Sequence, residues 1–311
     1  MKIVFMGTPD FAVPSLERLN ASGHTVAAVV TAPDKPGGRG RKIQGSPVKN
    51  TALRLGLPLL QPVKLKAPEF IAELKKINPD ILIVVAFRIL PREVYSIARF
   101  GAVNAHASLL PKYRGAAPIH WAVLKGERET GITTFQIEDK VDTGGILLQK
   151  KIPISPEDTT GTLYEQLKVL AAETLLETLD GLEKGALKPV RQDHALATPA
   201  PKIFPEMAVL DFSESGEHIV NTARAFSPVP GARFFLNKNM IKILKCRFQP
   251  QENTNPGKLE HLSKSQFAIH CADGLIIPDE IQTEGKKRMA VRDFLNGFDL
   301  SGFGYVDENA G

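Results

Sequence analysis

The sequence predicts an α/β protein with a mostly parallel sheet in its first part and a smaller domain of β-strands in its last part. Three observations support this prediction. Continuous apolar runs alternate with helix-like stretches as far as residue 187, the stretch 188–205 is polar and interrupted by prolines, and later apolar runs are short. Apolar strands that alternate with helices are typical of a parallel sheet covered on both faces. We expect a first domain over 1–187, a linker over 188–205 and a second domain over 206–311.

The first part of the chain contains the alternating pattern. Its strand-like runs are Lys2–Gly7, Thr25–Thr31, Asp80–Phe87 and Gly101–His106. Stretches with helical spacing between or after them are 8–23, Ala67–Ile77 and 91–100. Two more strand-like runs, Gly131–Asp139 and Ile146–Ile154, precede a long helical stretch that ends near Gly185. Strands alternating with helices in this order predict βαβ units and therefore a parallel sheet.

The last part of the chain has a different pattern of apolar residues. Its apolar runs read HIVNTARAF, ARFFL, MIKILKCRF, FAIHCA and GLIIPDEIQ, and turn residues such as NKN, NPG and ADG separate them. Short strands at this spacing favour a small β-barrel or sandwich.

Composition excludes several classes of protein. With 43% hydrophobic and 23% charged residues, the chain is close to the globular average and is not a disordered sequence. Only Cys246 and Cys271 are present, so there is neither a disulfide framework nor a CxxC metal site. The N-terminus lacks a secretory apolar region, and no run of eighteen apolar residues occurs. We expect a cytoplasmic protein that does not enter the membrane; no heptad pattern or obvious interface patch predicts an oligomer or an obligate protein partner.

Positive charge is concentrated in two windows. Residues 33–66 contain eight basic side chains and one acid, and residues 224–258 contain seven basic side chains and one acid, although the whole chain has a net charge of only +5. Concentrated positive charge is typical of a protein that binds a polyanion, and a solvated basic surface is the alternative. In the first window, the stretch PDKPGGRGRK is expected to form a mobile loop because its prolines and glycines disfavour regular structure.

The turn after the first strand does not resemble a dinucleotide site. It reads Gly7-Thr8-Pro9-Asp10, without the glycines that let a backbone approach a pyrophosphate closely. A phosphate loop of the type GxxxxGK[ST] is also absent from the sequence. NAD and ATP binding are therefore disfavoured.

Three polar residues are candidates for chemistry. Asn104 and His106 are two positions apart at the end of an apolar strand, so their side chains share one face, and Asp142 follows the next strand in a VDTGG turn. Ligands of open α/β sheets bind at the carboxyl ends of strands. A hydrogen-bond donor, an acid or base and a carboxylate would meet there. The alternative is that Asn104 caps a turn and His106 is an ordinary buried histidine. With no serine or cysteine nucleophile in a suitable setting and no metal cluster, we expect direct group transfer.

The motifs around these residues resemble the methionyl-tRNA formyltransferases. The similar segments are FMGTPDF, GRGRKIQGSPVK, NAH followed by SLLPKYRGAAPI, the VDTG turn and RAFSPVPGA, and together they extend over nearly the whole chain. The resemblance implies a Rossmann-like formyltransferase domain followed by a β-barrel of the OB type. It also implies transfer of a formyl group from 10-formyltetrahydrofolate to the α-amino group of methionine on initiator Met-tRNA, with no metal required.

Roles for individual residues follow from the same resemblance. Asn104, His106 and Asp142 match the catalytic residues of the family, and Ser108, Leu109, Leu110 and Pro111 match its folate-contacting loop. Residues that match the tRNA-binding loop and a linker lysine near the substrate are Arg39, Arg41, Lys42 and Lys202. In the second domain, further phosphate contacts are expected from Arg233, Lys238, Lys242 and Lys245.

Two segments depart from the family pattern. The chain reads Ala86-Phe87-Arg88-Ile89 where the family often has an AYG-type segment, one residue longer, that borders the pterin pocket. RAFSPVPGA lacks a tryptophan often found there. The first departure leaves the exact pterin contacts open, whereas the expected reaction is unaffected.

Other functions remain as alternatives. Related folate-dependent enzymes act on glycinamide ribonucleotide or sugar nucleotides, or hydrolyse formyltetrahydrofolate. The first kind is usually a single domain, and the GGRGRK and RAFSPVPG segments favour the tRNA enzyme over the other two. A tRNA-binding protein on an inactive scaffold is the non-enzymatic alternative, which the joint presence of Asn104, His106 and Asp142 disfavours.

Overall fold

The computed structural model describes residues 1–37, 42–300 and 302–307, and its contacts divide the chain into two units. The first unit comprises 1–118, 129–153 and 164–201. The second comprises 119–128, 154–163 and 202–311. Two short segments that precede residue 164 in the sequence therefore belong to the second unit.

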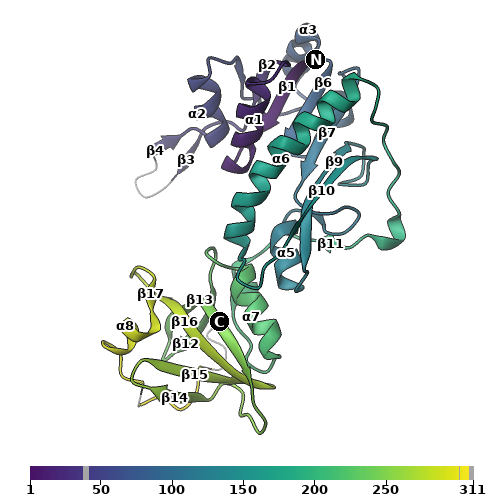
Figure 1. Cartoon of the computed structure of the whole chain (residues 1–311). Helices are drawn as coiled ribbons and strands as arrows, with labels where there is room; N and C mark the ends of the chain where they lie inside the picture. Colours follow the sequence, from purple (N-terminus) through teal and green to yellow (C-terminus); the bar gives the residue numbers. More distant parts are fainter. Residues whose placement is uncertain (38–41, 301, 308–311) are drawn as a thin grey trace. The chain divides into compact units, whose positions relative to one another are not determined.

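A seven-stranded sheet forms the centre of the first unit (Figure 1). Its strands, in spatial order, are β10 (Ile146–Pro153), β9 (Glu129–Gln136), β7 (Ala102–His106), β6 (Ile81–Val85), β1 (Lys2–Gly7), β2 (Thr25–Val30) and β5 (Leu59–Leu60). The pairs β7–β6, β6–β1, β1–β2 and β2–β5 are parallel, whereas β9 pairs antiparallel with both β7 and β10. The expected mostly parallel sheet is confirmed, with an antiparallel edge.

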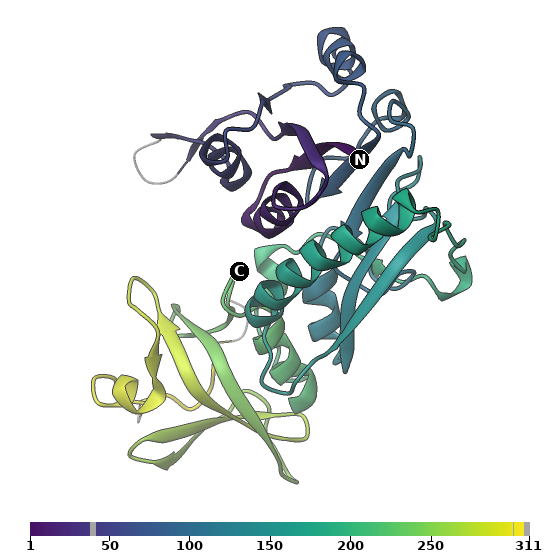
Figure 2. The ribbon, with the colours of Figure 1, turned by 45° about the horizontal axis from the view of Figure 1, so that its top comes forward.

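Helices cover both faces of this sheet. In the first unit they are α1 (Val13–Asn20), α2 (Pro47–Arg54), α3 (Pro68–Ile77), α4 (Arg92–Tyr95) and most of α6 (Thr160–Glu183), whereas α5 (Pro118–Leu124) belongs to the second unit from Ile119 onward. α3 buries Phe70 and Leu74 in one cluster with Val4 and Met6 of β1. α6 runs along a face of the sheet in both views, and its Thr178 hydroxyl is 2.7 Å from that of Thr134 on β9 (Figure 1, Figure 2). α4 has only four residues, so the helix expected over 91–100 is largely wrong.

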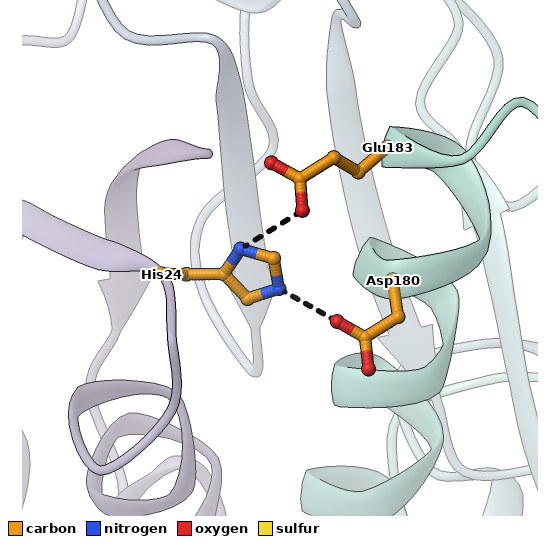
Figure 3. A group of neighbouring side chains, drawn as sticks. All are labelled: His24, Asp180 and Glu183. Atoms are coloured by element: carbon orange, nitrogen blue, oxygen red, sulfur yellow. Dashed lines mark hydrogen bonds and ion pairs between the residues drawn. The ribbon is translucent and has the colours of Figure 1, made fainter.

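The last turns of α6 are tied to the loop before β2 by His24 (Figure 3). The His24 Nε2 atom lies 3.1 Å from Asp180 Oδ1, and its Nδ1 atom lies 3.9 Å from Glu183 Oε2. The ammonium of Met1 is 3.0 Å from the same Nδ1 atom. Because Asp180 and Glu183 are three residues apart on a helix, both carboxylates reach one imidazole. These contacts fix the end of α6 at the amino-terminal edge of the sheet.

Part of the PDKPGGRGRK stretch has regular structure. β3 (Lys35–Gly37) pairs antiparallel with β4 (Lys42–Gln44), and the hairpin projects from the sheet (Figure 1, Figure 2). The expectation that proline and glycine exclude regular structure is therefore wrong for 35–37 and for Lys42, while residues 38–41 lie outside the described residues. Pro36 is accommodated because a two-stranded ribbon consists of edge strands, which tolerate a missing N–H donor.

The second unit contains an antiparallel sheet. Its hydrogen-bonded order is β12 (Ala232–Leu236), β13 (Asn239–Pro250), β16 (Gly274–Thr283), β15 (Gln266–Cys271) and β14 (Leu259–Ser263), with β17 (Met289–Ala290) also paired to β16. The short helix α8 (Val291–Leu295) follows β17. A separate antiparallel β domain is confirmed. Among the residues described, the pairings form an open path, so closure into an OB-type barrel stays a prediction.

The run HIVNTARAF is helical, which corrects its interpretation as one of the short strands. It forms α7 (Gly216–Ala225), capped by the Ser215 hydroxyl, which accepts a hydrogen bond from the backbone N–H of His218. Ile219, Thr222 and Ala223 are buried at the i, i+3 and i+4 positions of one helical face. A serine cap followed by apolar residues at this spacing predicts a helix. The shortness of the apolar run, taken alone, does not distinguish a helix from a strand.

None of the helices that the structure describes combines the length and the apolar character needed to cross a membrane.

Candidate active site

Strand β7 places Asn104 and His106 at the carboxyl edge of the first unit's sheet. Asn104 is opposite Val84 of β6 and Phe135 of β9, and His106 is opposite Thr133 of β9. Their side chains share one face because they are two positions apart. β7 lies next to β6, and the two strands are parallel, so both end at this edge. This is the edge where open α/β sheets bind ligands.

His106 is buried and both ring nitrogens face protein atoms. Its Nε2 atom is 2.7 Å from the backbone oxygen of Tyr113, and its Nδ1 atom is 3.7 Å from Asp142 Oδ2. A carbonyl oxygen can only accept, so the Nε2–H group donates this hydrogen bond. In the neutral ring the lone pair is then on Nδ1, the atom that faces the carboxylate. The structure therefore brings His106 and Asp142 together. In the neutral ring, Nδ1 is the basic nitrogen and it faces the carboxylate.

Asp142 lies in the turn between β9 and β10, with a φ angle of 54°. Aspartate tolerates this left-handed backbone conformation better than most residues. Its Oδ2 atom accepts a hydrogen bond of 2.8 Å from the backbone N–H of Gly115. Gly115 has a φ of 125°, and a Cβ atom there would lie 2.6 Å from the Ala200 oxygen. Only glycine fits this position, where its N–H reaches the carboxylate.

Asn104 is half-buried at the same edge. Among residues 1–37, 42–300 and 302–307, no hydrogen bond engages its side-chain amide. The amide is therefore available to donate to a ligand at the end of β7.

The loop expected to contact folate is held by a buried hydrogen-bond network. The Ser108 hydroxyl donates to the Lys112 oxygen at 2.7 Å, and the Thr133 hydroxyl donates to the Ser108 oxygen at 2.7 Å. Thr133 also accepts from the Leu110 N–H at 3.1 Å, and Gln149 donates to the Leu110 oxygen at 2.9 Å. Ser108 thus contributes its hydroxyl to the loop itself. The loop, which includes Leu109 and Pro111, has a fixed shape directly after His106.

The residues expected to bind tRNA are not all described. Arg39 and Arg41 lie outside the described residues, and Lys42 is the first residue of β4. Lys202 belongs to the second unit, where its ammonium lies 5.5 Å from the ring centre of Phe204.

Gln192 is a site residue that sequence reasoning missed. It lies in the expected linker yet is only 3% exposed and contacts the Asp142 turn. The same segment pairs with the loop after His106 through β8 (Arg114–Gly115) and β11 (Pro199–Ala200). A Pro-punctuated polar segment has no periodicity to reveal such contacts.

The segment 86–91, which departs from the family pattern, also follows a strand that ends at this edge. Ala86 has a φ of 47°. The Arg88 guanidinium donates to the backbone oxygens of Pro62 and Val63 at 2.8 and 3.0 Å. Burial lowers the pKa of Arg88 from its usual value. Arg88 therefore joins the segment after β6 to the loop after β5.

Among the described residues, metal-ligating side chains come close together in the group His24, Asp180 and Glu183. The two carboxylates approach opposite nitrogens of the ring (Figure 3), so their ion pairs do not converge on one point. This group lies at the amino-terminal edge of the sheet, opposite the edge that holds His106. It is not part of the candidate active site.

Both cysteine thiols belong to the sheet of the second unit and are poor nucleophiles. Burial raises the pKa of Cys246 to about 12 and also raises that of Cys271. Because the thiolate is the reactive species, we expect both thiols to react slowly with iodoacetamide at pH 8 and rapidly after unfolding. Mass spectrometry of native and guanidinium-treated samples measures this. Fast labelling of the native protein with loss of activity would indicate a reactive thiol.

Comparisons with known proteins identify the fold and the family of the chain. The family model described as "Formyl transferase" matches residues 1–179, and that described as "Formyl transferase, C-terminal domain" matches residues 202–299. A solved N-formyltransferase from Helicobacter canadensis, in complex with folinic acid and dTDP-3-aminofucose, has the same fold, with a TM-score of 0.67 and 22% identity over 91% of this chain and 99% of that one. HypX from Aquifex aeolicus in complex with tetrahydrofolic acid has a TM-score of 0.61 and 20% identity, covering 97% of this chain and 48% of that one.

A curated relative is much more similar in sequence. The methionyl-tRNA formyltransferase of Geobacter metallireducens is 44% identical over 298 residues, which cover 96% of each chain. The alignment extends through both units and includes the segment 180–201 between the two family matches. The chain therefore belongs to the methionyl-tRNA formyltransferase family.

Proposed function

We propose that this protein transfers the formyl group of 10-formyltetrahydrofolate to the α-amino group of methionine on initiator Met-tRNA. The proposal is carried by the juxtaposition of His106 and Asp142 at the end of the strand that also holds Asn104, whose amide has no hydrogen bond within the described residues. The chain is also 44% identical over 298 residues to a curated methionyl-tRNA formyltransferase. The co-substrate of this family is 10-formyltetrahydrofolate. The reaction belongs to translation initiation, and we propose the cytoplasm as its compartment.

The environment of His106 supports a role as the base. As the methionine nitrogen attacks the formyl carbon, a C–N bond forms and the nitrogen must lose a proton. The Nδ1 lone pair of neutral His106 accepts that proton, and Asp142 then faces an imidazolium. The Tyr113 oxygen keeps Nε2 protonated throughout. The tetrahedral intermediate collapses when its bond to the folate nitrogen breaks and that nitrogen takes up the proton held by His106, which returns the imidazole to its neutral form.

Asn104 supports the same step in a different way. The formyl oxygen becomes negatively charged in the intermediate, and a fixed donor aimed at it is often the largest catalytic contribution. The Asn104 amide offers N–H donors without an internal partner in the part of the chain that the structure describes. We propose the Ser108–Pro111 loop as the binding surface for folate beside these residues.

Recognition of tRNA is proposed to use the basic windows. In the second unit, three cations have protein partners: Arg233 donates to the Pro205 oxygen, Lys242 to the Pro230 oxygen, and Lys245 pairs with Glu157 at 2.6 Å. Lys238, in the turn between β12 and β13, is exposed. Because three of these four cations already have protein partners, we assign the main electrostatic contribution to Arg39, Arg41 and Lys42 of the first basic window. Contacts of basic side chains with a phosphate track weaken as the salt concentration rises.

The test is transfer of labelled formyl from 10-formyltetrahydrofolate to charged initiator Met-tRNA, with uncharged tRNA and an amino-sugar nucleotide as controls. Label on Met-tRNA alone supports the reaction, its donor and its acceptor. The sugar nucleotide is the relevant alternative because a protein of the same fold is a sugar N-formyltransferase. Label on the sugar, or folate consumption without any labelled acceptor, would contradict the proposed acceptor.

Arg39→Ala is expected to raise KM for Met-tRNA about 10- to 100-fold, the range for loss of a charge-assisted hydrogen bond. The value of kcat at saturating tRNA should change less, and KM for folate should not change. Steady-state kinetics at two salt concentrations measure this, because a lost phosphate contact also lowers the salt dependence of binding. The exposed Lys184→Ala variant is a matched control. Unchanged kinetics for Arg39→Ala would remove the loop from the proposal.

A further inference from the structure

We propose that Gln192 is a positioning residue for the reaction, because its side chain holds the turn that presents Asp142 to His106. This inference rests on the proposed function and adds a residue from the segment between the two family matches. Gln192 is 3% exposed and lies in the first unit, as do His106 and Asp142.

All the hydrogen-bonding capacity of the Gln192 amide is used. The NH₂ group donates to the backbone oxygens of Asp142 and Gly144, at 3.0 and 2.8 Å. The Oε1 atom accepts from two nitrogens of Arg114, Nε at 3.2 Å and Nη2 at 2.6 Å. Because backbone oxygens only accept and a guanidinium only donates, the amide can have just one orientation. A fully satisfied buried amide of this kind fixes the groups around it.

These contacts determine the position of the Asp142 carboxylate from two sides. On one side, Gln192 anchors the backbone oxygen of Asp142 itself, a residue in the left-handed conformation that needs surrounding support. On the other side, Gln192 anchors Arg114, whose neighbour Gly115 donates its N–H to Asp142 Oδ2 at 2.8 Å. The same Oδ2 atom is 3.7 Å from His106 Nδ1. One side chain thus supports both the turn and the donor that orient this oxygen.

If Gln192 had a purely structural role, its loss would detach the segment and destabilise the fold. The segment remains attached without it, since Tyr113 N–H donates to the Thr198 hydroxyl at 2.9 Å and Arg114 N–H to the Thr198 oxygen at 2.9 Å. Ala116 N–H also donates to the Ala200 oxygen at 2.8 Å. Loss of the Gln192 amide should therefore leave the fold intact and loosen only the Asp142 turn.

The experiment is a double-mutant cycle read by formyl transfer. Gln192→Ala is expected to lower kcat about 10- to 100-fold, with KM for folate and Met-tRNA within about twofold of the wild-type values. In an Asp142→Asn background, the same substitution should lower kcat by less than about twofold, because the group it positions no longer acts as a carboxylate. Gln192→Glu keeps an acceptor for Arg114 and loses the two donors, so it should behave like Gln192→Ala.

Two controls keep the outcomes separate. The exposed Gln251→Ala variant should have wild-type kinetics, and the thermal melting of each variant reports folding. Equal kcat losses from Gln192→Ala in both backgrounds, or a change in KM alone, would overturn the positioning role. Wild-type protein that labels a different acceptor would contradict the proposed function instead, and the cycle would then be measured with that acceptor.

Discussion

Replacing His106 with alanine is expected to lower kcat about 10²- to 10⁴-fold, the usual contribution of a positioned general base. The physical reason is the tautomer that Tyr113 imposes. With Nε2–H donated to a backbone oxygen, Nδ1 is the basic atom, and it faces the carboxylate of Asp142 at 3.7 Å. Without the imidazole, the attacking amine has no adjacent base and the Asp142 charge has no cation to stabilise.

Single-turnover kinetics with excess enzyme measure the chemical step directly, and filter binding measures tRNA affinity. We expect the affinity of His106→Ala for Met-tRNA to match that of the wild type, because the substitution removes no positive charge from the basic windows. The exposed His218→Ala variant of the second unit is a matched control for histidine loss. A His106→Ala enzyme with a wild-type rate would remove His106 from the catalytic proposal.

The Asn104→Ala variant is expected to lose about 10²- to 10³-fold in kcat, which corresponds to about 2.7–4 kcal/mol of transition-state stabilisation. An oxyanion forms only during the reaction, so the loss should appear in kcat, whereas KM for folate should stay nearly constant. Steady-state kinetics with each substrate varied in turn measure this difference. Asn104→Asp has nearly the same shape and replaces the N–H donors with a negative charge, and it should be at least as slow.

Asn20→Ala, at the exposed end of α1, provides the matched control for asparagine loss. If Asn104→Ala raised KM for folate and kept kcat, the amide would bind the ground state instead of the transition state. The proposed contact with the oxyanion would then be wrong.

The sequence predicts the sheet well because its strands are buried on both faces. β6 is buried at all five residues, and β1 at every residue after Lys2, so each appears as an uninterrupted apolar run. Such runs need no long-range information to be recognised. By contrast, the sequence of α7 resembles a short strand because its apolar run is short. The start of the helix is marked by the Ser215 cap, which is a polar signal.

In the candidate site, too, local sequence patterns predict some residues and miss those that depend on distant contacts. Asn104 and His106 follow from strand periodicity, and Asp142 follows from a turn after a strand. Gln192 could not be predicted, because its role depends on hydrogen bonds to the Asp142 turn, fifty residues away in sequence. The β3–β4 pairing likewise joins residues across a stretch of glycines, where local propensity gives no signal.

The segments 119–128 and 154–163 have a consequence for dividing the protein into fragments. They belong to the second unit, where Arg224 of α7 donates to the backbone oxygens of Ser155 and Asp158 at 3.1 Å, and the rings of His120 and Phe226 are 6.4 Å apart. A recombinant fragment that starts at residue 202 would leave α7 without these partners. The part from residue 202 onward therefore cannot be exchanged on its own. A chimaera that exchanges it must also exchange 119–128 and 154–163 to keep the native core of the second unit.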